Sequence, residues 1–264
     1  SQMITGGGAL NAASAIASLG GDVSLAGAIG DDAFGHFLRQ KMMDRSIDVQ
    51  FVRTVLGATT SRSTNMITPD GDRTIVNHRH AELGPGALDL PPAFTFDAAL
   101  VDTRWPDAAA QIVDAAKRAG KPAVVDAEAP ILHAQAVLEG ASHVVFSEQG
   151  LVDFCGGNDV EALSDAARKL GCWCAVTRGA LPVLCHDGAR LSEVPAYPTV
   201  AVNTLGAGDV WHGAFTLALS KGNHEIDAVR WANAATSLKV GRPIAVEELP
   251  TAADVETLLK LQGL

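Results

Sequence analysis

Short apolar runs alternate with longer amphipathic stretches along most of the chain. Short apolar runs are typical of buried strands, whereas segments with an apolar side chain every three or four residues are typical of helices. The pattern predicts strands at 23–29, 98–102, 122–126, 143–146, 174–177 and 181–186, and helices at 107–119, 131–138, twice within 148–170, and at 207–220, 226–239 and 252–261. Strands and helices that alternate in this way form a mainly parallel sheet covered on both faces, so we expect an α/β fold with three α/β/α layers.

The segment 59–80 departs from this alternation because it is rich in β-forming residues. Residues 63–68 and 73–78 are predicted strands, and the sequence Pro-Asp-Gly-Asp at 69–72 between them is typical of a tight turn. This hairpin is expected to be part of a small β lid. No interdomain linker is visible, so we expect residues 1–264 to form a single domain that carries this lid.

Composition and charge exclude several classes of function. The chain has 264 residues, of which 47% are hydrophobic and 19% charged, and its net charge is −10. No apolar run approaches the roughly 20 residues of a membrane span, and lysine and arginine form no long run suited to phosphate backbones. We therefore expect neither a membrane nor a nucleic acid as a partner. The four cysteines match no metal or disulfide spacing, which predicts free thiols and a cytoplasmic location.

The most specific chemical signal is the run NTLGAGD at residues 203–209, at the start of the predicted helix 207–220. Small residues at a helix start expose backbone N–H groups, here those of Gly206, Ala207 and Gly208, and the helix dipole favours an anion there. Asp209 adds a carboxylate that can orient a hydroxyl and take its proton. An anion hole beside a base is what phosphoryl transfer to an alcohol requires. The pattern alone also allows an alternative without chemistry, in which the run is a glycine-rich turn and Asp209 only caps the helix.

The run resembles the DTxGAGD signature of the ribokinase-like (PfkB) carbohydrate kinases. GGGALNAA at residues 6–13 resembles the family's GGxxxN motif, and LG at 19–20 with GAIGDDAFG at 27–35 resembles its continuation. The resemblance covers nearly the whole chain. It implies a ribokinase-like fold and transfer of the ATP γ-phosphoryl group to a primary hydroxyl of a sugar. Mg²⁺ would bridge the phosphates, and Asp209 would be the catalytic base.

The same resemblance assigns further residues to the substrates. Gly7 and Gly8 would let the backbone approach the sugar, whose hydroxyls Asn11 would bind. The segment VTRG at 176–179 resembles the family's nucleotide-lining VTxG, which implicates Thr177 and Gly179, and Asn233 would lie near the adenine. Asn233 could equally belong to the core or to a helix surface. In the family the lid often joins subunits, so the resemblance also implies a homodimer.

Three departures from the family pattern matter. Asn203 stands where the signature usually has an aspartate that helps to bind a monovalent cation, which leaves potassium dependence open. SEQG at 147–150 replaces the NxxE motif, and Glu148 is the neighbouring carboxylate that could act on Mg²⁺ through water. The family's first strand and its sugar-binding aspartate have no counterpart, and we expect that segment to precede Ser1.

Two polar residues are candidates for the distal or charged end of the sugar, namely Asn77 in the hairpin and Arg104 after the strand 98–102. A guanidinium suits an anionic substituent because its donors form a fork. DTRW at 102–105 and FSEQGL at 146–151 resemble the bacterial sulfofructose kinase branch, in which the matching Asn and Arg contact the sulfonate.

Other interpretations remain open at this stage. Arg104 could pair with Asp102 or Asp107 rather than with a sugar. The enzyme could also be a kinase of neutral sugars or nucleosides. Finally, the protein could be a sensor that binds a sugar or nucleotide without turnover, although an intact Asp209 favours the enzyme.

Overall fold

A six-stranded sheet forms the centre of the computed structural model, which describes residues 3–67, 73–84, 86–91, 94–131, 134–243 and 249–263. The strands are β5 (Ala99–Asp102), β6 (Ala123–Ala127), β7 (His143–Ser147), β8 (Trp173–Thr177), β9 (Val183–His186) and β10 (Leu191–Val194), in the order β10-β9-β8-β7-β6-β5. Strands β5 to β8 pair in parallel, whereas β9 and β10 are antiparallel because short turns connect them. The expected mainly parallel sheet is confirmed.

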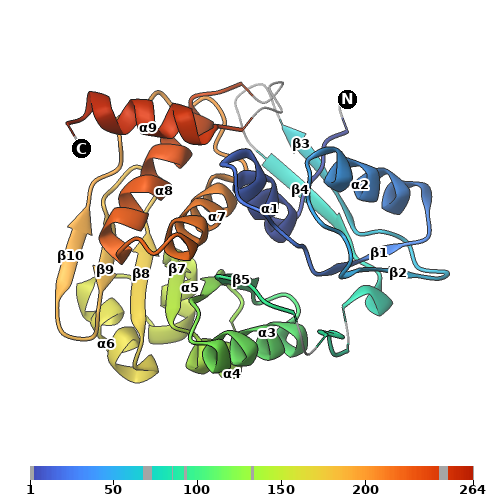
Figure 1. Cartoon of the computed structure of the whole chain (residues 1–264), viewed down its shortest axis with the longest axis horizontal. Helices are drawn as coiled ribbons and strands as arrows, with labels where there is room; N and C mark the ends of the chain where they lie inside the picture. Colours follow the sequence, from blue (N-terminus) through green and yellow to red (C-terminus); the bar gives the residue numbers. More distant parts are fainter. Residues whose placement is uncertain are drawn as a thin grey trace.

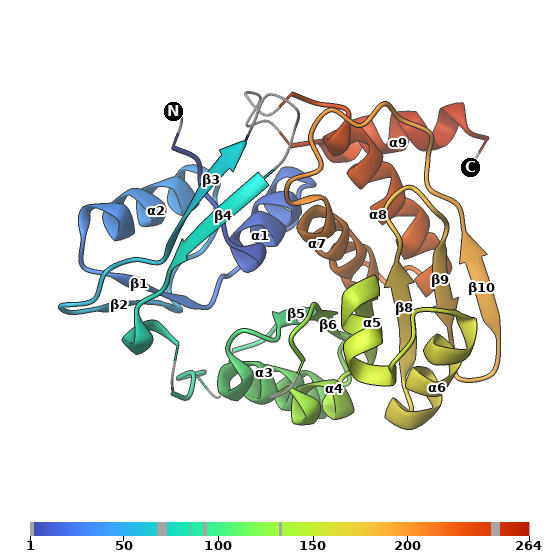
Figure 2. The same ribbon diagram turned by 180° about the vertical axis from the view of Figure 1, so that it is seen from behind.

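Helices cover both faces of the sheet (Figures 1 and 2). One layer contains α3 (Pro106–Ala119), α4 (Gln135–Gly140), α5 (Glu148–Cys155) and α6 (Val160–Leu170). The other contains α1 (Gly8–Ser18), α7 (Ala207–Ser220) and α8 (Glu225–Val240), with α9 (Ala252–Leu261) packed against α8. The three-layer α/β/α sandwich expected from the sequence is confirmed.

Side-chain alternation along the strands decides which residues reach each layer, since successive side chains of a strand point to opposite faces. The side chains in the cluster with α7 and α8 are Leu100, Val124, Val145 and Ala175. Those in the cluster with α3 to α6 are Val101, Val125, Val144 and Val176. Two residues beyond the first set, still on the α7 side, polar side chains occupy the carboxyl ends of the strands: Asp102, Asp126, Ser147 and Thr177. Ligands of parallel sheets bind at this edge.

Helices α1 and α7 approach each other closely. A Cβ atom at Gly213 would lie 2.6 Å from the carbonyl oxygen of Ala12, so the contact requires a glycine there. This approach brings the first turns of the two helices together, although they are far apart in the sequence. The aromatic side chains behind this contact stack on one another, with ring centroids 5.0 Å apart for Trp211 and Phe215.

The N-terminal part adds two small sheets beside the sandwich (Figure 1). Its remaining elements are β1 (Gly27–Gly30), α2 (Ala33–Asp44), β2 (Val52–Val55), β3 (Arg62–Ile67), β4 (Arg73–His78) and the 3-10 helix η1 (Ala81–Leu83). Strands β1 and β2 pair in parallel, and β3 and β4 form an antiparallel hairpin. Its expected turn at 69–72 lies outside the described residues. The role of 59–80 as a lid, the single domain and the strand expected ahead of Ser1 all stay predictions.

Most element boundaries agree with the sequence pattern within one or two residues. The strand expected at 23–29 is shorter and lies at 27–30, with an isolated parallel bridge between Ser24 and Asp48. The helix expected at 131–138 begins at Gln135, and residues 132 and 133 lie outside the described part. None of the described helices is long and apolar enough to cross a membrane.

Candidate active site

Asp209 lies in the first turn of α7 and is held by α1. Asn11 Nδ2 donates a hydrogen bond of 2.7 Å to Oδ2 of Asp209. A Cβ atom at Gly8 would lie 3.2 Å from the other oxygen, Oδ1, so the absence of a side chain at Gly8 keeps that oxygen approachable. The structure therefore brings together three residues that the sequence predicted from two separate motifs.

The backbone around Asp209 carries the predicted anion hole. Gly206 is the N-cap of α7 with φ of 71°, a left-handed conformation that favours glycine. The N–H of Ala207 donates to the carbonyl oxygen of Thr204 at 3.2 Å. The N–H groups of Gly206 and Gly208 have no acceptor within the described part of the chain, as expected for the first turn of a helix. Two of the three predicted donors thus remain available to an anion.

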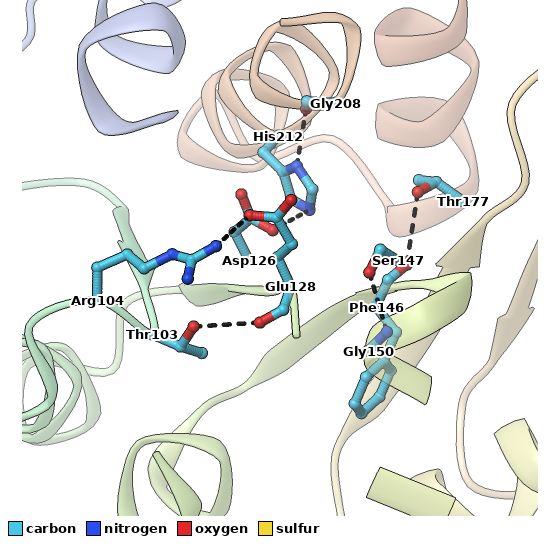
Figure 3. A network of polar contacts seen from close by, with 10 residues as sticks. All are labelled: Thr103, Arg104, Asp126, Glu128, Phe146, Ser147, Gly150, Thr177, Gly208 and His212. Atoms are coloured by element: carbon cyan, nitrogen blue, oxygen red, sulfur yellow. Dashed lines mark hydrogen bonds and ion pairs between the residues drawn. The ribbon is translucent and has the colours of Figure 1, made fainter. Parts of the chain in front are cut away.

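A histidine and a carboxylate lie beneath this first turn (Figure 3). His212 is 4% exposed, and its Nδ1 lies 2.7 Å from the carbonyl oxygen of Gly208. Its Nε2 lies 3.5 Å from Oδ1 of Asp126, which projects from the end of β6. Its burial is that of a packed side chain. Its contact with Asp126 links α7 to the sheet.

The strand ends gather further carboxylates around the site. Asp102 of β5 pairs in register with Asp126 of β6, so both side chains lie on the α7 side of the sheet. Burial is the largest cause that raises the pKa of Asp102, Asp126 and Asp209 above the ordinary value. For Asp209, the hydrogen bond from Asn11 and the nearby His212 lower the pKa, while Glu128 and Asp102 raise it further. A carboxylate in these surroundings holds a proton more readily than an exposed aspartate.

Arg104 lies at the same edge and forms an ion pair (Figure 3). Its Nη2 donates to Oε2 of Glu128 at 2.7 Å, and its backbone N–H donates to Oδ1 of Asp102 at 2.9 Å. The expected alternative partners of the guanidinium were Asp102 and Asp107, and the structure shows Glu128 instead. Both side chains are solvent-accessible, at 39% for Arg104 and 63% for Glu128, so the pair can rearrange.

The other predicted substrate residues lie in different surroundings. Asn77 is exposed on β4, and its Oδ1 accepts a hydrogen bond from Ser63 of the paired strand. No described contact joins Asn77 to Asn11, Asp209 or Arg104. Gly7 is the N-cap of α1, with φ of 107°. Glycine is therefore required at this position for the conformation of the backbone alone.

Two of the predicted nucleotide residues belong to the strand end of β8. Thr177 is its last residue, and its hydroxyl donates to the carbonyl oxygen of Phe146 at 3.4 Å. Gly179 is exposed in the turn that follows, with φ of 60°. Arg178 between them donates to the carbonyl oxygen of Pro182 through Nε and Nη2, which fixes this turn. Their role toward the nucleotide stays a prediction.

Asn233 is 4% exposed within α8. Its Oδ1 accepts from Trp211 Nε1 at 2.8 Å, and its Nδ2 donates to the carbonyl oxygens of Pro195 at 3.0 Å and Val194 at 3.4 Å. These contacts are those of a core residue, which is one of the alternatives that the sequence left open for Asn233. The side chain links α7, α8 and the end of β10, and a direct contact with adenine stays untested.

Among the described residues, no group of three or more His, Cys, Asp or Glu side chains could hold a metal ion. Glu148 is an exposed carboxylate in the first turn of α5, directly after β7. Ser147 before it accepts from the N–H of Gly150 at 3.0 Å and caps this helix. Mg²⁺ usually keeps several waters and is bound through one or two carboxylates together with substrate phosphates. One exposed carboxylate at this edge fits an ion that is held mainly by water and phosphate.

Asp126 and Glu128 were not predicted as site residues from the sequence. Both follow the apolar pair Val124-Val125 in the segment VVDAE, and a polar residue that ends a buried strand is the signal that could have found them. Asp102 was considered only as a partner of Arg104. These carboxylates influence Asp209 through the tertiary structure, which no local pattern contains.

Comparison with known proteins agrees with this geometry. The model of the family described as pfkB family carbohydrate kinase matches residues 2–252. Ribokinase of Bacillus subtilis (strain 168) is 27% identical over 98% of this chain and 88% of its own. Aminoimidazole riboside kinase of Salmonella typhimurium is 28% identical over 98% of this chain and 89% of its own.

A solved structure extends this likeness to the fold. Arabidopsis thaliana ribokinase, complexed with ribose and ATP, is 25% identical and superposes with a TM-score of 0.83. The alignment covers 98% of this chain and 88% of that chain. The chain therefore belongs to the pfkB family of carbohydrate kinases and is a sugar kinase with the ribokinase-like fold.

Proposed function

We propose that this kinase transfers the γ-phosphoryl group of ATP to a primary hydroxyl of a ketohexose or an anionic sugar such as sulfofructose, with Asp209 as the base. The observation that carries the proposal is the position of Asp209. Its carboxylate lies at the start of α7, beside the N–H groups of Gly206 and Gly208, and Asn11 holds one of its oxygens. Base and anion hole are thus parts of one helical turn.

The two oxygens of Asp209 have different roles in this proposal. Oδ2 accepts from Asn11, which fixes the orientation of the carboxylate. Oδ1 has no hydrogen bond to any described residue and faces Gly8, so it can accept the proton of the sugar hydroxyl. Burial raises the pKa of Asp209, which makes the carboxylate a stronger base than an exposed aspartate.

Phosphoryl transfer depends mainly on positioning and on stabilisation of negative charge. The N–H groups of Gly206 and Gly208 would accept the charge of the transferring group, aided by the positive end of the α7 dipole. Mg²⁺ on the ATP phosphates would neutralise further charge. The exposed carboxylate of Glu148 would act on this ion in place of the missing NxxE motif. Thr177 and Gly179 would line the nucleotide. Asn11, Gly7 and Gly8 would contact the sugar.

Arg104 supports an acceptor with an anionic substituent. The guanidinium lies at the carboxyl-end edge of the sheet, and one of its terminal nitrogens is bonded to Glu128, whose charge acts on Asp209. A sulfonate or carboxylate could either bind the remaining donors or displace the exposed Glu128 side chain, since an exposed pair is weak. Asn77 from the lid would complete that end of the site.

A kinase of neutral sugars or nucleosides is the second candidate. The carboxylates Asp102, Asp126 and Glu128 near the site favour it, because they accept hydrogen bonds from hydroxyl groups and repel an anion. The relatives named above include kinases of both ribose and a riboside. In this alternative, Arg104 and Glu128 are a pair without a role in choosing the acceptor.

The hairpin offers a surface for a second copy of the chain. Met66 and Val76 are 52% and 57% exposed. They lie on one face of the hairpin, because Thr64 pairs with Val76 and Met66 with Thr74. Asn77 lies on the opposite face. We expect a homodimer by size-exclusion chromatography with light scattering, and a monomer for Met66→Glu with Val76→Glu; a monomeric wild type would contradict this.

The four thiols are free, which supports the proposal of a reducing, cytoplasmic setting. Residues 155, 172, 174 and 185 are partly or fully buried, and none takes part in the site. Fractionation of cells that produce the tagged chain, with a periplasmic and a cytosolic marker enzyme as references, tests this directly. Recovery with the periplasmic marker would contradict it.

ATP-dependent phosphorylation of a panel of acceptors tests the proposed function. The panel contains ribose, fructose, 2-keto-3-deoxygluconate, 6-deoxy-6-sulfofructose and adenosine, each with the wild type and with Asp209→Asn. We expect turnover of sulfofructose or fructose, and a loss of about 10²- to 10⁴-fold in kcat in the variant with ATP binding retained. Binding of ATP without turnover of any acceptor would instead support a sensor.

A further inference from the structure

Lys239 lies in the last turn of α8 and is 9% exposed. Its Nζ donates to the carbonyl oxygen of Asn203 at 3.0 Å and also to that of Leu205. Both carbonyls belong to the loop immediately before Gly206, the N-cap of α7. A buried lysine thus binds the backbone of the segment that leads into the anion hole.

Further hydrogen bonds join this loop to the same end of α8. The N–H groups of Val202 and Asn203 donate to the carbonyl oxygen of Val240 at 2.8 and 3.0 Å. The side chain of Asn203 is directed back to its own loop, where Oδ1 accepts from the N–H of Leu205 at 3.0 Å. Lys239 therefore adds a positive charge to hydrogen bonds that otherwise join neutral backbone and amide groups of the described loop and helix end.

The surroundings suit a monovalent cation. Carbonyl oxygens bind an ammonium group, and the carboxyl end of α8 adds the negative end of its helix dipole. Burial lowers the pKa of Lys239, while the carboxylate of Asp209 raises it. A carbonyl oxygen that loses this donor and that water does not reach costs about 1–3 kcal/mol. A donor or a cation at this position therefore stabilises the loop in this conformation.

We propose that Lys239 acts as a built-in monovalent cation of the active site. Its ammonium group holds the loop 203–205 and so keeps the N–H groups of Gly206 and Gly208 directed at the transferring phosphoryl group. The enzyme therefore needs no added potassium. Lys239 is a positioning residue, because it acts through the loop. The catalytic part of this inference rests on the proposed phosphoryl transfer, whereas the binding of the loop does not.

Two variants and the choice of salt test this role. Lys239→Ala leaves a space lined by two carbonyl oxygens, whereas Lys239→Met fills it with an apolar side chain of similar length. Turnover and Tm are measured in KCl, NH₄Cl and choline chloride at equal ionic strength. We expect the wild type to be the same in all three salts, and Lys239→Ala to lose about 10²-fold in turnover in choline chloride.

The decisive result is selective rescue of Lys239→Ala. We expect K⁺ or NH₄⁺, but not choline, to restore turnover at least several-fold and to raise Tm, while Lys239→Met responds to neither cation. A wild type that requires K⁺, or a Lys239→Met variant as active as the wild type, would overturn the proposal. The Tm readout needs no turnover, so it separates this inference from the proposed function. If the wild type phosphorylates no sugar but K⁺ selectively raises the Tm of Lys239→Ala, the proposed function is wrong and the binding of the loop by Lys239 still holds.

Discussion

His212 and Asp126 face each other beneath the first turn of α7, with Nε2 of the imidazole 3.5 Å from Oδ1 of the carboxylate. Because a carbonyl oxygen only accepts, Nδ1 must carry the proton that is donated to the carbonyl oxygen of Gly208. Nε2 is buried and has no hydrogen-bond partner among the described residues. Burial raises the pKa of Asp126 and favours a proton that the carboxyl can donate to Nε2, whereas a charge on His212 lowers this pKa.

The first prediction concerns Asp126→Asn and stability. Burial raises the pKa of Asp126, so the folded state binds this proton more tightly than the unfolded state does. Its contribution to stability is present below the unfolded pKa and is lost as the pH rises through the folded pKa. Asparagine does not titrate, and its amide can donate to Nε2. We expect the Tm gain of Asp126→Asn over the wild type to be larger at pH 8 than at pH 4.

Asp187→Asn is the matched control for this measurement. The backbone N–H groups of Ala189 and Arg190 lower the pKa of this exposed carboxylate. Its contribution is therefore present at high pH and is lost as the pH falls, which is the opposite dependence. Equal behaviour of the two variants in thermal melts from pH 4 to 8 would contradict the account of Asp126.

The second prediction concerns the pH dependence of catalysis. Asp209 must be ionised to act as a base, and burial raises its pKa, so kcat/KM should fall at acidic pH through a pKa above the ordinary aspartate value of 3.8. The hydrogen bond from Asn11 lowers this pKa. Asn11→Ala should therefore shift the acidic limb of the kcat/KM profile to higher pH. Asn223→Ala, a substitution of an exposed residue, serves as the control. If the acidic limb of the profile does not move in Asn11→Ala, Asp209 is not the group that titrates there.

The third prediction tests the close approach of α1 and α7. In Gly213→Ala the new Cβ would lie 2.6 Å from the carbonyl oxygen of Ala12, so the helices must move apart. Overpacking of this kind typically costs about 1–3 kcal/mol. We expect this loss in urea denaturation, with a lower kcat because Asn11 and Asp209 separate.

Gly27→Ala is the control for Gly213→Ala, since a Cβ there would have no neighbour within 4 Å. It should leave both the free energy of unfolding and the kcat near their wild-type values. A Gly213→Ala protein as stable as Gly27→Ala would show that the two helices can separate at no cost.

The fourth prediction separates the two candidate acceptors. If Arg104 binds an anionic substituent, Arg104→Ala should raise the KM for sulfofructose about 10- to 100-fold, the range expected for a charge-assisted hydrogen bond. The KM for fructose should stay nearly unchanged. Glu128→Gln removes the competing carboxylate and should lower the KM for sulfofructose. Equal KM changes for both sugars in Arg104→Ala would favour the neutral acceptor.

Much of the fold follows from local patterns in the sequence. The alternation of apolar strands and amphipathic helices predicts the parallel sheet, because strand burial and helix spacing are properties of neighbouring residues. The run at 203–209 likewise predicts the turn at Gly206 and the position of Asp209 at a helix start. The hydrogen bond between Asn11 and Asp209 was not predicted, because the resemblance implied only that Asn11 binds the sugar hydroxyls and that Asp209 is the base.

The contacts that could not be predicted from the sequence depend on tertiary packing. The register between β5 and β6 puts Asp102 beside Asp126, and no local pattern encodes a register between strands of a parallel sheet. Lys239 resembles an ordinary basic residue in the last turn of a helix, and only the position of the loop 203–205 reveals its partners. From the sequence, Asn233 could lie near the adenine or be a plain core or helix-surface residue, and only the hydrogen bond from Trp211 reveals the core contact.

The hydrogen bond between Asn11 and Asp209 has a consequence for how the enzyme comes to be made. Its two partners are separated by 198 residues, so at about 5–20 residues per second a ribosome needs about 10–40 s to pass from one to the other. Nascent chains in that interval hold Asn11 of α1 but lack Asp209, the proposed base. Phosphorylating capacity therefore arises in a single late step of synthesis, and chains interrupted before α7 cannot consume ATP through this site.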